Sequence, residues 1–231
     1  MSSNEPAISP TEGLMPKLVV EAIGTFFLLL TIAMLVLGAG DAGEHAGLVS
    51  PVGIGLVLTV LVFAFGPISG AHFNPAVTIG LYLAGRCPKA HVAPYLVAEC
   101  IGAVAAAFVA LQLRTVPEAA FEPAHAAGFA AEAIWTFLLV CVILQITSKR
   151  NAGNQWFGIV VGATVAAGAY VMGPDSGAAF NPAVYLGLAL DGVLAWSDWW
   201  IYLGGPILGG CVAAAVQPII EPGDAVPVGP V

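Results

Sequence analysis

The residues best suited to do chemistry in this chain are two asparagines, each followed by proline and alanine. Asn74 stands in Gly-Ala-His-Phe-Asn-Pro-Ala-Val-Thr, and Asn181, 107 residues later, stands in Gly-Ala-Ala-Phe-Asn-Pro-Ala-Val-Tyr. Asparagine is favoured just before a helix and proline at the first helical position. Each Asn-Pro-Ala box therefore predicts a helix start with an amide at its tip. The residues of the two boxes are Asn74, Pro75, Ala76, Asn181, Pro182 and Ala183.

The chemistry open to these boxes is the recognition of a neutral polar solute. The N-terminus of a helix is equivalent to about half a positive charge, which disfavours cations. The amides of Asn74 and Asn181 add N–H donors that a solute oxygen can accept. The sequence contains no nucleotide-binding loop, metal-ligand cluster or nucleophile–base pair. We therefore expect no cofactor, no metal, and neither an enzyme nor an energised pump.

Composition places the two boxes in a membrane. Hydrophobic residues make up 59% of the 231 residues, charged residues only 9%, and the mean hydropathy is +0.93. A soluble domain carries roughly 25% charged residues. The length allows about six spans of roughly 20 residues. We predict an all-α membrane protein with one membrane domain, surrounded by lipid and without a nucleic-acid partner.

Two short segments between longer ones predict re-entrant half-helices. Segments 75–84 and 182–190 follow the asparagines and reach about 15 Å each, half of the roughly 30 Å hydrocarbon core. Three spans per half invert the second half relative to the first, so the half-helices enter from opposite faces and meet at the midplane. The six predicted spans are 17–38, 48–65, 91–113, 129–147, 156–172 and 199–217.

Basic residues predict the orientation of the bundle. Five of the six lie before the first span, after the first half-helix or after the fourth span: Lys17, Arg86, Lys89, Lys149 and Arg150. The positive-inside rule makes those places cytoplasmic; only Arg114 departs from it. We predict a multi-pass protein of the inner (plasma) membrane with both termini in the cytoplasm. Its predicted parts are a tail at 1–16, a channel domain at 17–217 with repeats at about 17–114 and 128–217, and a tail at 218–231.

A pair of glutamates opens corresponding spans in the two halves. Glu21 begins Glu-Ala-Ile-Gly-Thr-Phe-Phe-Leu, and Glu132 begins Glu-Ala-Ile-Trp-Thr-Phe-Leu-Leu. An ionisable group at membrane depth faces the bundle interior and needs a partner. A re-entrant loop has backbone N–H groups that lipid cannot satisfy. We expect each carboxylate to accept N–H bonds from one loop; a glutamate reaching out to interfacial water is the alternative.

The loops before the half-helices, 69–73 and 176–180, can present rows of backbone carbonyls to a pore. Donors at the middle, acceptors on one side and apolar walls suit small uncharged molecules passing in single file. The predicted carbonyl positions are Gly70, Ala71, His72, Phe73, Gly177 and Ala179.

These motifs together resemble the aquaporin, or major intrinsic protein, family. The resemblance covers residues 17–217 and rests on both Asn-Pro-Ala boxes, the run from Ser69 to Thr78, the two glutamates, and Pro-Ile-Leu-Gly-Gly from position 206. It implies an aquaporin-like bundle of six transmembrane helices plus two re-entrant half-helices in an inverted repeat. It also implies one pore per subunit and a homotetramer.

The chain departs from the family at the outer constriction. Most family members carry an arginine after the second Asn-Pro-Ala, where this sequence has Val184. The resemblance implies a selectivity filter of Ile54, Ala169, Ala178 and Val184, which is apolar and unusually wide. Water, glycerol, urea, ammonia, peroxide and metalloid acids such as arsenite are then candidate solutes. Some bacterial aquaglyceroporins linked to arsenic resistance also lack the arginine. Tyr185 replaces the aspartate of glycerol facilitators.

Two further residues leave alternatives open. Glu99, where many relatives have glutamine, either pairs or stays protonated in the third span. It is a pH-sensitive element or a packing and hydrogen-bonding group. His72 either gates the cytoplasmic mouth or packs within its loop. The four cysteines lack metal or redox spacing, and Cys87 is expected to be a solvated loop thiol.

Two other functional classes compete with a passive channel. An ion-coupled secondary transporter of a small solute also uses broken helices and inverted repeats. A poorly conducting structural membrane protein is the third class. A channel gives unsaturating flux, a transporter saturates, and a structural protein conducts nothing.

Overall fold

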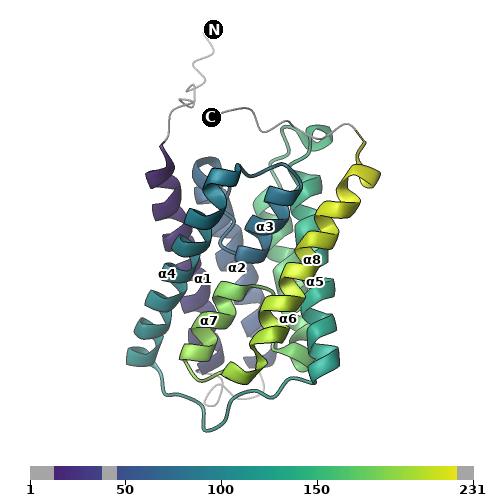
Figure 1. The fold of residues 1–231 in the computed structure, drawn as a ribbon. Helices are drawn as coiled ribbons and strands as arrows, with labels where there is room; N and C mark the ends of the chain where they lie inside the picture. The colour runs from purple at the N-terminus through teal and green to yellow at the C-terminus, as the bar shows by residue number, and fades with distance from the viewer. Residues whose placement is uncertain (1–12, 38–45, 223–231) are drawn as a thin grey trace.

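The computed structural model describes residues 13–37 and 46–222. Figure 1 shows the described part as an all-helical bundle, in agreement with the predicted fold class. The predicted tails at 1–16 and 218–231 fall mainly outside the described residues, as does the last residue of the first predicted span, Gly38. The helices are α1 Leu14–Leu37, α2 Ala46–Ser69, α3 Pro75–Leu83, α4 Lys89–Leu113, α5 His125–Ile146, η2 Lys149–Asn151, α6 Phe157–Ser176, α7 Pro182–Leu190, η3 Trp196–Asp198 and α8 Trp199–Ile220.

Six of the described helices are long and apolar enough to cross a bilayer, which confirms the predicted spans. Two of them, α2 and α6, continue one turn beyond the predicted ends at 65 and 172. Both extensions begin with Gly-Pro, at Gly66-Pro67 and Gly173-Pro174. Proline removes one backbone donor but does not prevent the last turn from forming, so the Gly-Pro signal ended each predicted span too early.

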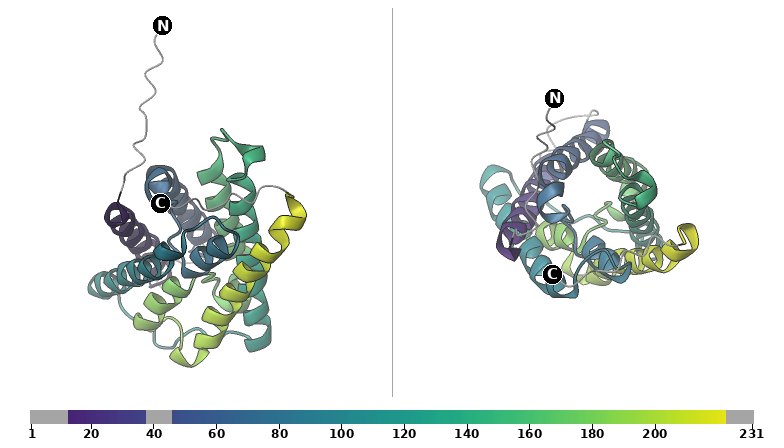
Figure 2. Two further views of the ribbon diagram at one scale, coloured as in Figure 1. Left: turned by 45° about the horizontal axis from the view of Figure 1, so that its top comes forward. Right: turned by 90° about the horizontal axis from the view of Figure 1, so that it is seen from above.

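The two halves of the chain pack in the same way. Helix α1 packs on α4 and α2 in the first half, and α5 packs on α8 and α6 in the second. The short helices cross over, because α3 packs on α8 and α7 on α4, while α2 and α6 join the halves. Figure 2 shows the long helices from above as a ring around the two short ones. This arrangement is the inverted repeat that the sequence predicts.

Glycine allows the closest helix contacts at equivalent positions. A Cβ at Gly102 of α4 would overlap the backbone of α1 at Ala22. A Cβ at Gly209 of α8, 107 residues later, would overlap the backbone of α5 at Ala133. Small residues let membrane helices approach until their backbones touch. Each half is therefore held by the same glycine-mediated contact.

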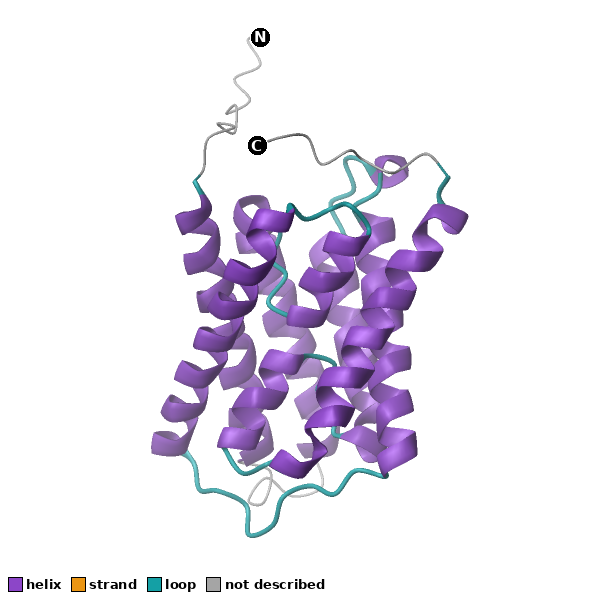
Figure 3. Ribbon diagram, viewed as in Figure 1, coloured by secondary structure: helices purple, strands orange, loops and turns teal. Residues whose placement is uncertain are grey.

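The two short helices lie end to end inside the ring. Figure 1 shows α3 and α7 one above the other, and Figure 3 shows the loops before them running back into the bundle to about mid-height. Each short helix has nine residues, so neither crosses the bundle alone. Their N-terminal ends point toward each other.

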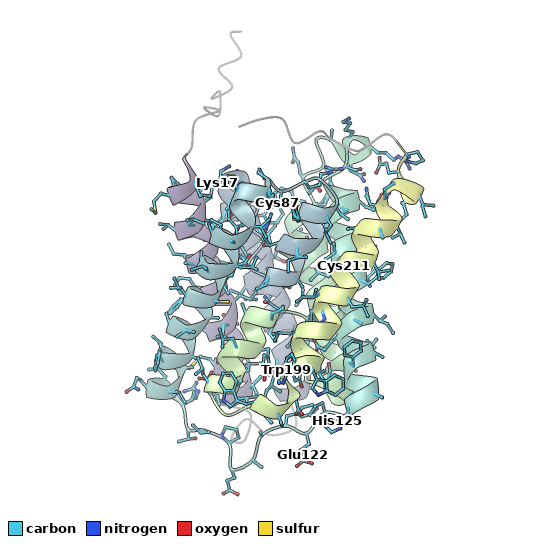
Figure 4. The ribbon with its side chains drawn as sticks, viewed as in Figure 1. Lys17, Cys87, Glu122, His125, Trp199 and Cys211 are labelled. Carbon is cyan, nitrogen blue, oxygen red and sulfur yellow. The ribbon has the colours of Figure 1, made fainter. Side chains whose placement is uncertain are left out.

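Residues labelled in Figure 4 mark the two ends of the bundle. In Figure 4, Lys17 and Cys87 lie at the end where α3 finishes, and Glu122 and His125 lie at the end where α7 finishes. We call these ends the α3 face and the α7 face.

The expectation that Cys87 is a solvated thiol was wrong. Its side chain is 3% exposed, because the turn after α3 folds back, with the Arg86 N–H donating to the Leu81 carbonyl at 2.7 Å. Burial raises the pKa of the Cys87 thiol to about 11. A short polar loop in the sequence therefore does not expose all of its residues.

Candidate pore

Each asparagine caps the short helix that follows it. The backbones of Asn74 and Asn181 are extended, with φ of −158° and −155°. The side-chain Oδ1 of Asn74 accepts from the Ala76 N–H at 2.9 Å, and that of Asn181 accepts from the Ala183 N–H at 2.9 Å. This is the geometry of an N-cap, followed by proline at the first helical position. The cap turns the remaining part of each amide, its NH2 group, away from its own helix.

The two NH2 groups cross between the halves. Asn74 Nδ2 donates to the Phe180 carbonyl at 2.9 Å, and Asn181 Nδ2 donates to the Phe73 carbonyl at 2.8 Å. Both asparagines are nearly buried, at 5% and 3% exposure. An amide nitrogen has two hydrogens, so each cross-bond leaves one N–H for the lumen. The sequence analysis predicted that the N–H donors of both amides face the solute, and it did not identify Phe180 as a partner.

The loops before the short helices have the same strained backbone in both halves. Left-handed φ angles occur at Ala71 and Phe73, at 52° and 51°, and at the equivalent Ala178 and Phe180, at 54° and 49°. Residues other than glycine adopt this region rarely and at a cost in free energy. Alternating conformations turn successive carbonyls of a loop in different directions, so one carbonyl can accept a cross-bond while its neighbour faces the lumen.

The two buried glutamates hold these loops. Glu21 accepts from the His72 N–H at 3.0 Å and from the Phe73 N–H at 2.6 Å. Glu132 accepts from the Ala179 N–H at 3.0 Å and from the Phe180 N–H at 2.5 Å. Both carboxyl groups are fully buried. Each carboxylate thus satisfies two loop donors that have no partner in lipid.

Serine and tyrosine residues complete the support, and the sequence analysis did not identify them. Ser69 and Ser176 accept through Oγ from the N–H groups of Ala71 and Ala178, both at 3.0 Å. The Tyr95 hydroxyl donates to the Ser69 carbonyl at 2.8 Å, and the Tyr202 hydroxyl donates to the Ser176 carbonyl at 2.6 Å. The signal was present, since both pairs repeat at the offset of 107 that separates the asparagines.

A narrow cavity of about 50 Å³ runs beside the asparagines and is lined by both halves. A wider vestibule of about 550 Å³ opens beside it on the α3 face, and the two share Ala71, Val77, Ile143 and Val161. None of the described residues that line the narrow cavity is Asp, Glu, Lys or Arg. Within residues 13–37 and 46–222, no cluster of three or more His, Cys, Asp or Glu could hold a metal ion.

The structure brings half of the predicted site residues to this lumen. Of the box residues, the two asparagines line the narrow cavity, whereas four line neither cavity: Pro75, Ala76, Pro182 and Ala183. Of the four filter positions, Ile54, Ala178 and Val184 line the narrow cavity; Ala169 does not, and Val165, one turn earlier on α6, does. Of the carbonyl positions, Ala71, His72 and Ala179 line the narrow cavity and Gly70 lines the vestibule. Phe73 and Gly177 line neither, and the Phe73 carbonyl is taken by Asn181.

Tyr185 and Glu99 lie outside the lumen lining. The Tyr185 ring stacks on Tyr202 with centroids 4.9 Å apart, and its hydroxyl lies 3.2 Å from the carbonyls of Ala195 and Trp196. Glu99 is fully buried in α4, with Oε1 accepting from the Thr78 hydroxyl at 2.7 Å. Glu99 therefore belongs to a hydrogen-bonded group behind the pore wall.

A ring of six spans around two half-length helices, joined at capped N-termini beside a lumen, defines a membrane channel. The sequence profile of the major intrinsic protein family matches residues 9–217. The chain belongs to this family, and it is therefore a passive channel of the aquaporin type and not an enzyme.

Curated aquaporins are among the relatives of the chain. It is 36% identical to a probable aquaporin NIP-type from Nicotiana alata, over 91% of this chain and 80% of that protein. It is 34% identical to aquaporin AqpM from Methanothermobacter thermautotrophicus, over 86% of this chain and 94% of that protein. The aquaglyceroporin structure from Plasmodium falciparum has the same fold, with a TM-score of 0.78 at 21% identity over 91% of this chain and 98% of that one.

Proposed function

We propose that this channel conducts small uncharged solutes through an unusually wide, apolar outer constriction made of Ile54, Ala169, Ala178 and Val184. The candidate solutes are water, glycerol, urea, ammonia, peroxide and metalloid acids such as arsenite. The observation that carries the proposal is the residue after the second Asn-Pro-Ala box. Val184 places an apolar side chain on the narrow cavity, at the point where α7 begins.

The walls of the cavity support this proposal. Its polar contributions are the two asparagine amides, His72 and loop carbonyls, and the side chains from the long helices are aliphatic. A solute with an oxygen atom can accept from Asn74 and Asn181 while its carbon skeleton faces Ile54 or Val184. An apolar constriction does not by itself speed water, because it can empty of water by dewetting.

Electrostatics favour the exclusion of cations. Two helix N-termini meet beside the lumen, each equivalent to about half a positive charge. No carboxylate among the described lining residues offsets them. A cation would lose hydration at this point without gaining an acceptor of matching charge. We infer that ions, protons included, are excluded despite the missing arginine.

The arrangement of charge supports a cytoplasmic α3 face. Lys17, Arg86 and Lys89 lie at or beside the ends of helices on that face, and Lys149 and Arg150 form η2 between α5 and α6. Positive residues favour the cytoplasmic side of a membrane protein. We propose an inner (plasma) membrane location with cytoplasmic termini and a homotetramer, as is typical of aquaporin channels.

A permeability panel tests the proposed constriction. Wild-type and Val184→Arg proteins are placed in liposomes, and the fluxes of water, glycerol, urea, ammonia, peroxide and arsenite are measured by stopped-flow light scattering or solute-specific detection. Val184→Arg narrows the lumen and adds a charge, so fluxes of the larger solutes should fall much more than that of water. Val184→Leu is the matched control that changes size without charge.

Equal losses for all solutes would contradict the proposed filter. Flux through a channel is unsaturating and has a low activation energy. Saturable, ion-dependent flux would instead support a coupled transporter, and absence of flux for every solute would support a structural membrane protein.

A further inference from the structure

A hydrogen-bonded chain leads from the buried Glu99 to the lumen. Glu99 Oε1 lies 2.7 Å from the Thr78 hydroxyl, which lies 2.9 Å from His72 Nδ1. Glu99 and Thr78 are fully buried, whereas His72 lines the narrow cavity. The three residues come from α4, from α3 and from the loop before it. Glu99, which does not line the lumen, is thus connected by hydrogen bonds to His72, which does.

We propose that Glu99 is a positioning residue of the pore: through Thr78 it keeps the proton of the neutral His72 ring on Nδ1, so that Nε2 presents a hydrogen-bond acceptor to the lumen. The argument follows from counting hydrogens. A threonine hydroxyl has one hydrogen. If Thr78 donates it to Glu99, its oxygen can only accept from His72, and the donor must be Nδ1–H.

The surroundings of Glu99 favour its role as an acceptor. The Thr78 hydroxyl points toward it, and the backbone N–H of Asn74, which can only donate, also faces the carboxyl group. Its second oxygen, Oε2, is buried and has no hydrogen-bond partner among the described residues. Thr78 donates to Oε1 whether Glu99 is ionised or carries a proton on Oε2. A proton on Oε1 would reverse both bonds and put the histidine proton on Nε2.

The other polar groups around His72 are already occupied. Both oxygens of Glu21 accept backbone N–H bonds from the loop. The ring centroids of Tyr95 and His72 lie 5.0 Å apart in an edge-on arrangement, but the Tyr95 hydroxyl donates to the Ser69 carbonyl. His91 stacks on the Tyr95 ring, with centroids 5.7 Å apart, and is not hydrogen-bonded to His72 in the described part of the chain. Thr78 is therefore the side chain that decides which ring nitrogen carries the hydrogen.

The consequence for the pore is an acceptor close to a donor. His72 Nε2 accepts from a passing solute, and two residues later the free N–H of Asn74 donates to it. A solute that can both donate and accept hydrogen bonds then finds a partner for each at successive positions along the lumen. If the ring proton of His72 were on Nε2, the lumen would meet a second hydrogen-bond donor in place of the acceptor.

The tautomer can be measured directly by nitrogen NMR. Full-length protein with 15N-labelled histidine is reconstituted in lipid nanodiscs at pH 8, where imidazole is neutral, and His72→Gln identifies the His72 signals. We expect Nδ1–H in the wild type. Thr78→Ser, which keeps the hydroxyl, should retain it, whereas Thr78→Val and Glu99→Leu should shift the population toward Nε2–H.

Flux gives the second readout. Because one hydrogen bond contributes about 0.5–1.5 kcal/mol, Thr78→Val should change the flux of a donating solute such as glycerol by about two- to tenfold relative to Thr78→Ser. Wild type with Nε2–H, or Thr78→Val that keeps Nδ1–H fully, would overturn the inference. The inference rests on the proposed channel function only in this flux measurement. If the wild-type protein conducts no solute, the proposed function is refuted. The tautomer of His72 measured by NMR still tests the inference in that case.

Discussion

The side-chain amide of Asn181 donates to the backbone carbonyl of Phe73, a residue 108 positions away in the other half of the chain, at 2.8 Å. Asn74 returns the same bond to Phe180. These bonds fix the distance between the two helix N-termini. The centre of the pore therefore depends on hydrogen bonds between the halves, in addition to the packing of the long helices.

Asn181→Asp should weaken both stability and ion exclusion. Aspartate keeps the N-cap, but it places a carboxylate oxygen against the Phe73 carbonyl and negative charge beside the positive helix ends. Leaving that buried carbonyl without a donor costs about 1–3 kcal/mol. We expect a lower thermal midpoint in detergent and measurable cation flux in liposomes. Asn74→Asp should give the same cation flux but a smaller loss of stability, because the Phe180 carbonyl also accepts from Thr136 Oγ1 at 3.3 Å. An equal or larger loss of stability for Asn74→Asp would contradict this account.

Glu21→Gln and Glu132→Gln should destabilise the protein to a similar extent. Glutamine has one acceptor oxygen, and its NH2 group would face a loop N–H that now has no partner. The loss is about 1–3 kcal/mol for each unsatisfied donor. Thermal unfolding in detergent measures it, with Glu122→Gln, on an exposed loop residue, as the control. Midpoints equal to that control would show that the loops do not need the carboxylates.

Gly102→Ala and Gly209→Ala should reduce the yield of folded protein. In each case the new methyl group meets the backbone of a neighbouring helix, which cannot move aside. Overpacking of this kind costs about 1–3 kcal/mol. Gly13→Ala, just before α1, is the control, because a Cβ at this position meets nothing within 4 Å. Size-exclusion profiles of the three variants should separate the first two from the third.

Asp191 should make stability fall as pH rises from about 4 to 6. Its carboxyl group, after the last residue of α7, is fully buried, and neither oxygen has a partner among the described residues. Burial raises the pKa of Asp191 to about 6, whereas an aspartate in the unfolded chain ionises near 3.8. Between these values the unfolded state releases a proton that the folded state retains, so folding weakens as pH increases.

Thermal midpoints of wild type and Asp191→Asn across pH 3.5–7 test this assignment. The asparagine variant cannot ionise, so its midpoint should fall less over this interval. Parallel curves for the two proteins would remove Asp191 as the source of the pH dependence.

The architecture could be predicted from the repeat in the sequence because each part of the repeated motif has a direct structural consequence. Segments too short to cross a bilayer, placed after helix-starting asparagines, leave few arrangements in which backbone groups are satisfied. The positions of Pro75 and Pro182 at the starts of α3 and α7 follow directly. Glu21 and Glu132 could be paired with the loops because a buried carboxylate and an unsatisfied loop each require a partner.

Other features could not be predicted from local patterns. The burial of Cys87 depends on how the turn after α3 folds back, and no short window of sequence encodes it. The Thr78–Glu99 contact joins two helices whose relative rotation is set by packing of the whole bundle. The division of each asparagine amide between the lumen and the opposite loop requires the positions of Phe73 and Phe180. Contacts between residues of different helices and loops could therefore not be predicted from the sequence alone.

The reciprocal asparagine bonds also make the two halves of the chain depend on each other. The buried Phe73 carbonyl of the first half accepts from Asn181, which precedes α7 in the second half. The first half alone therefore contains no partner for this carbonyl in its native position. A chain truncated before α7 cannot form the centre of the pore, however well its first four helices pack.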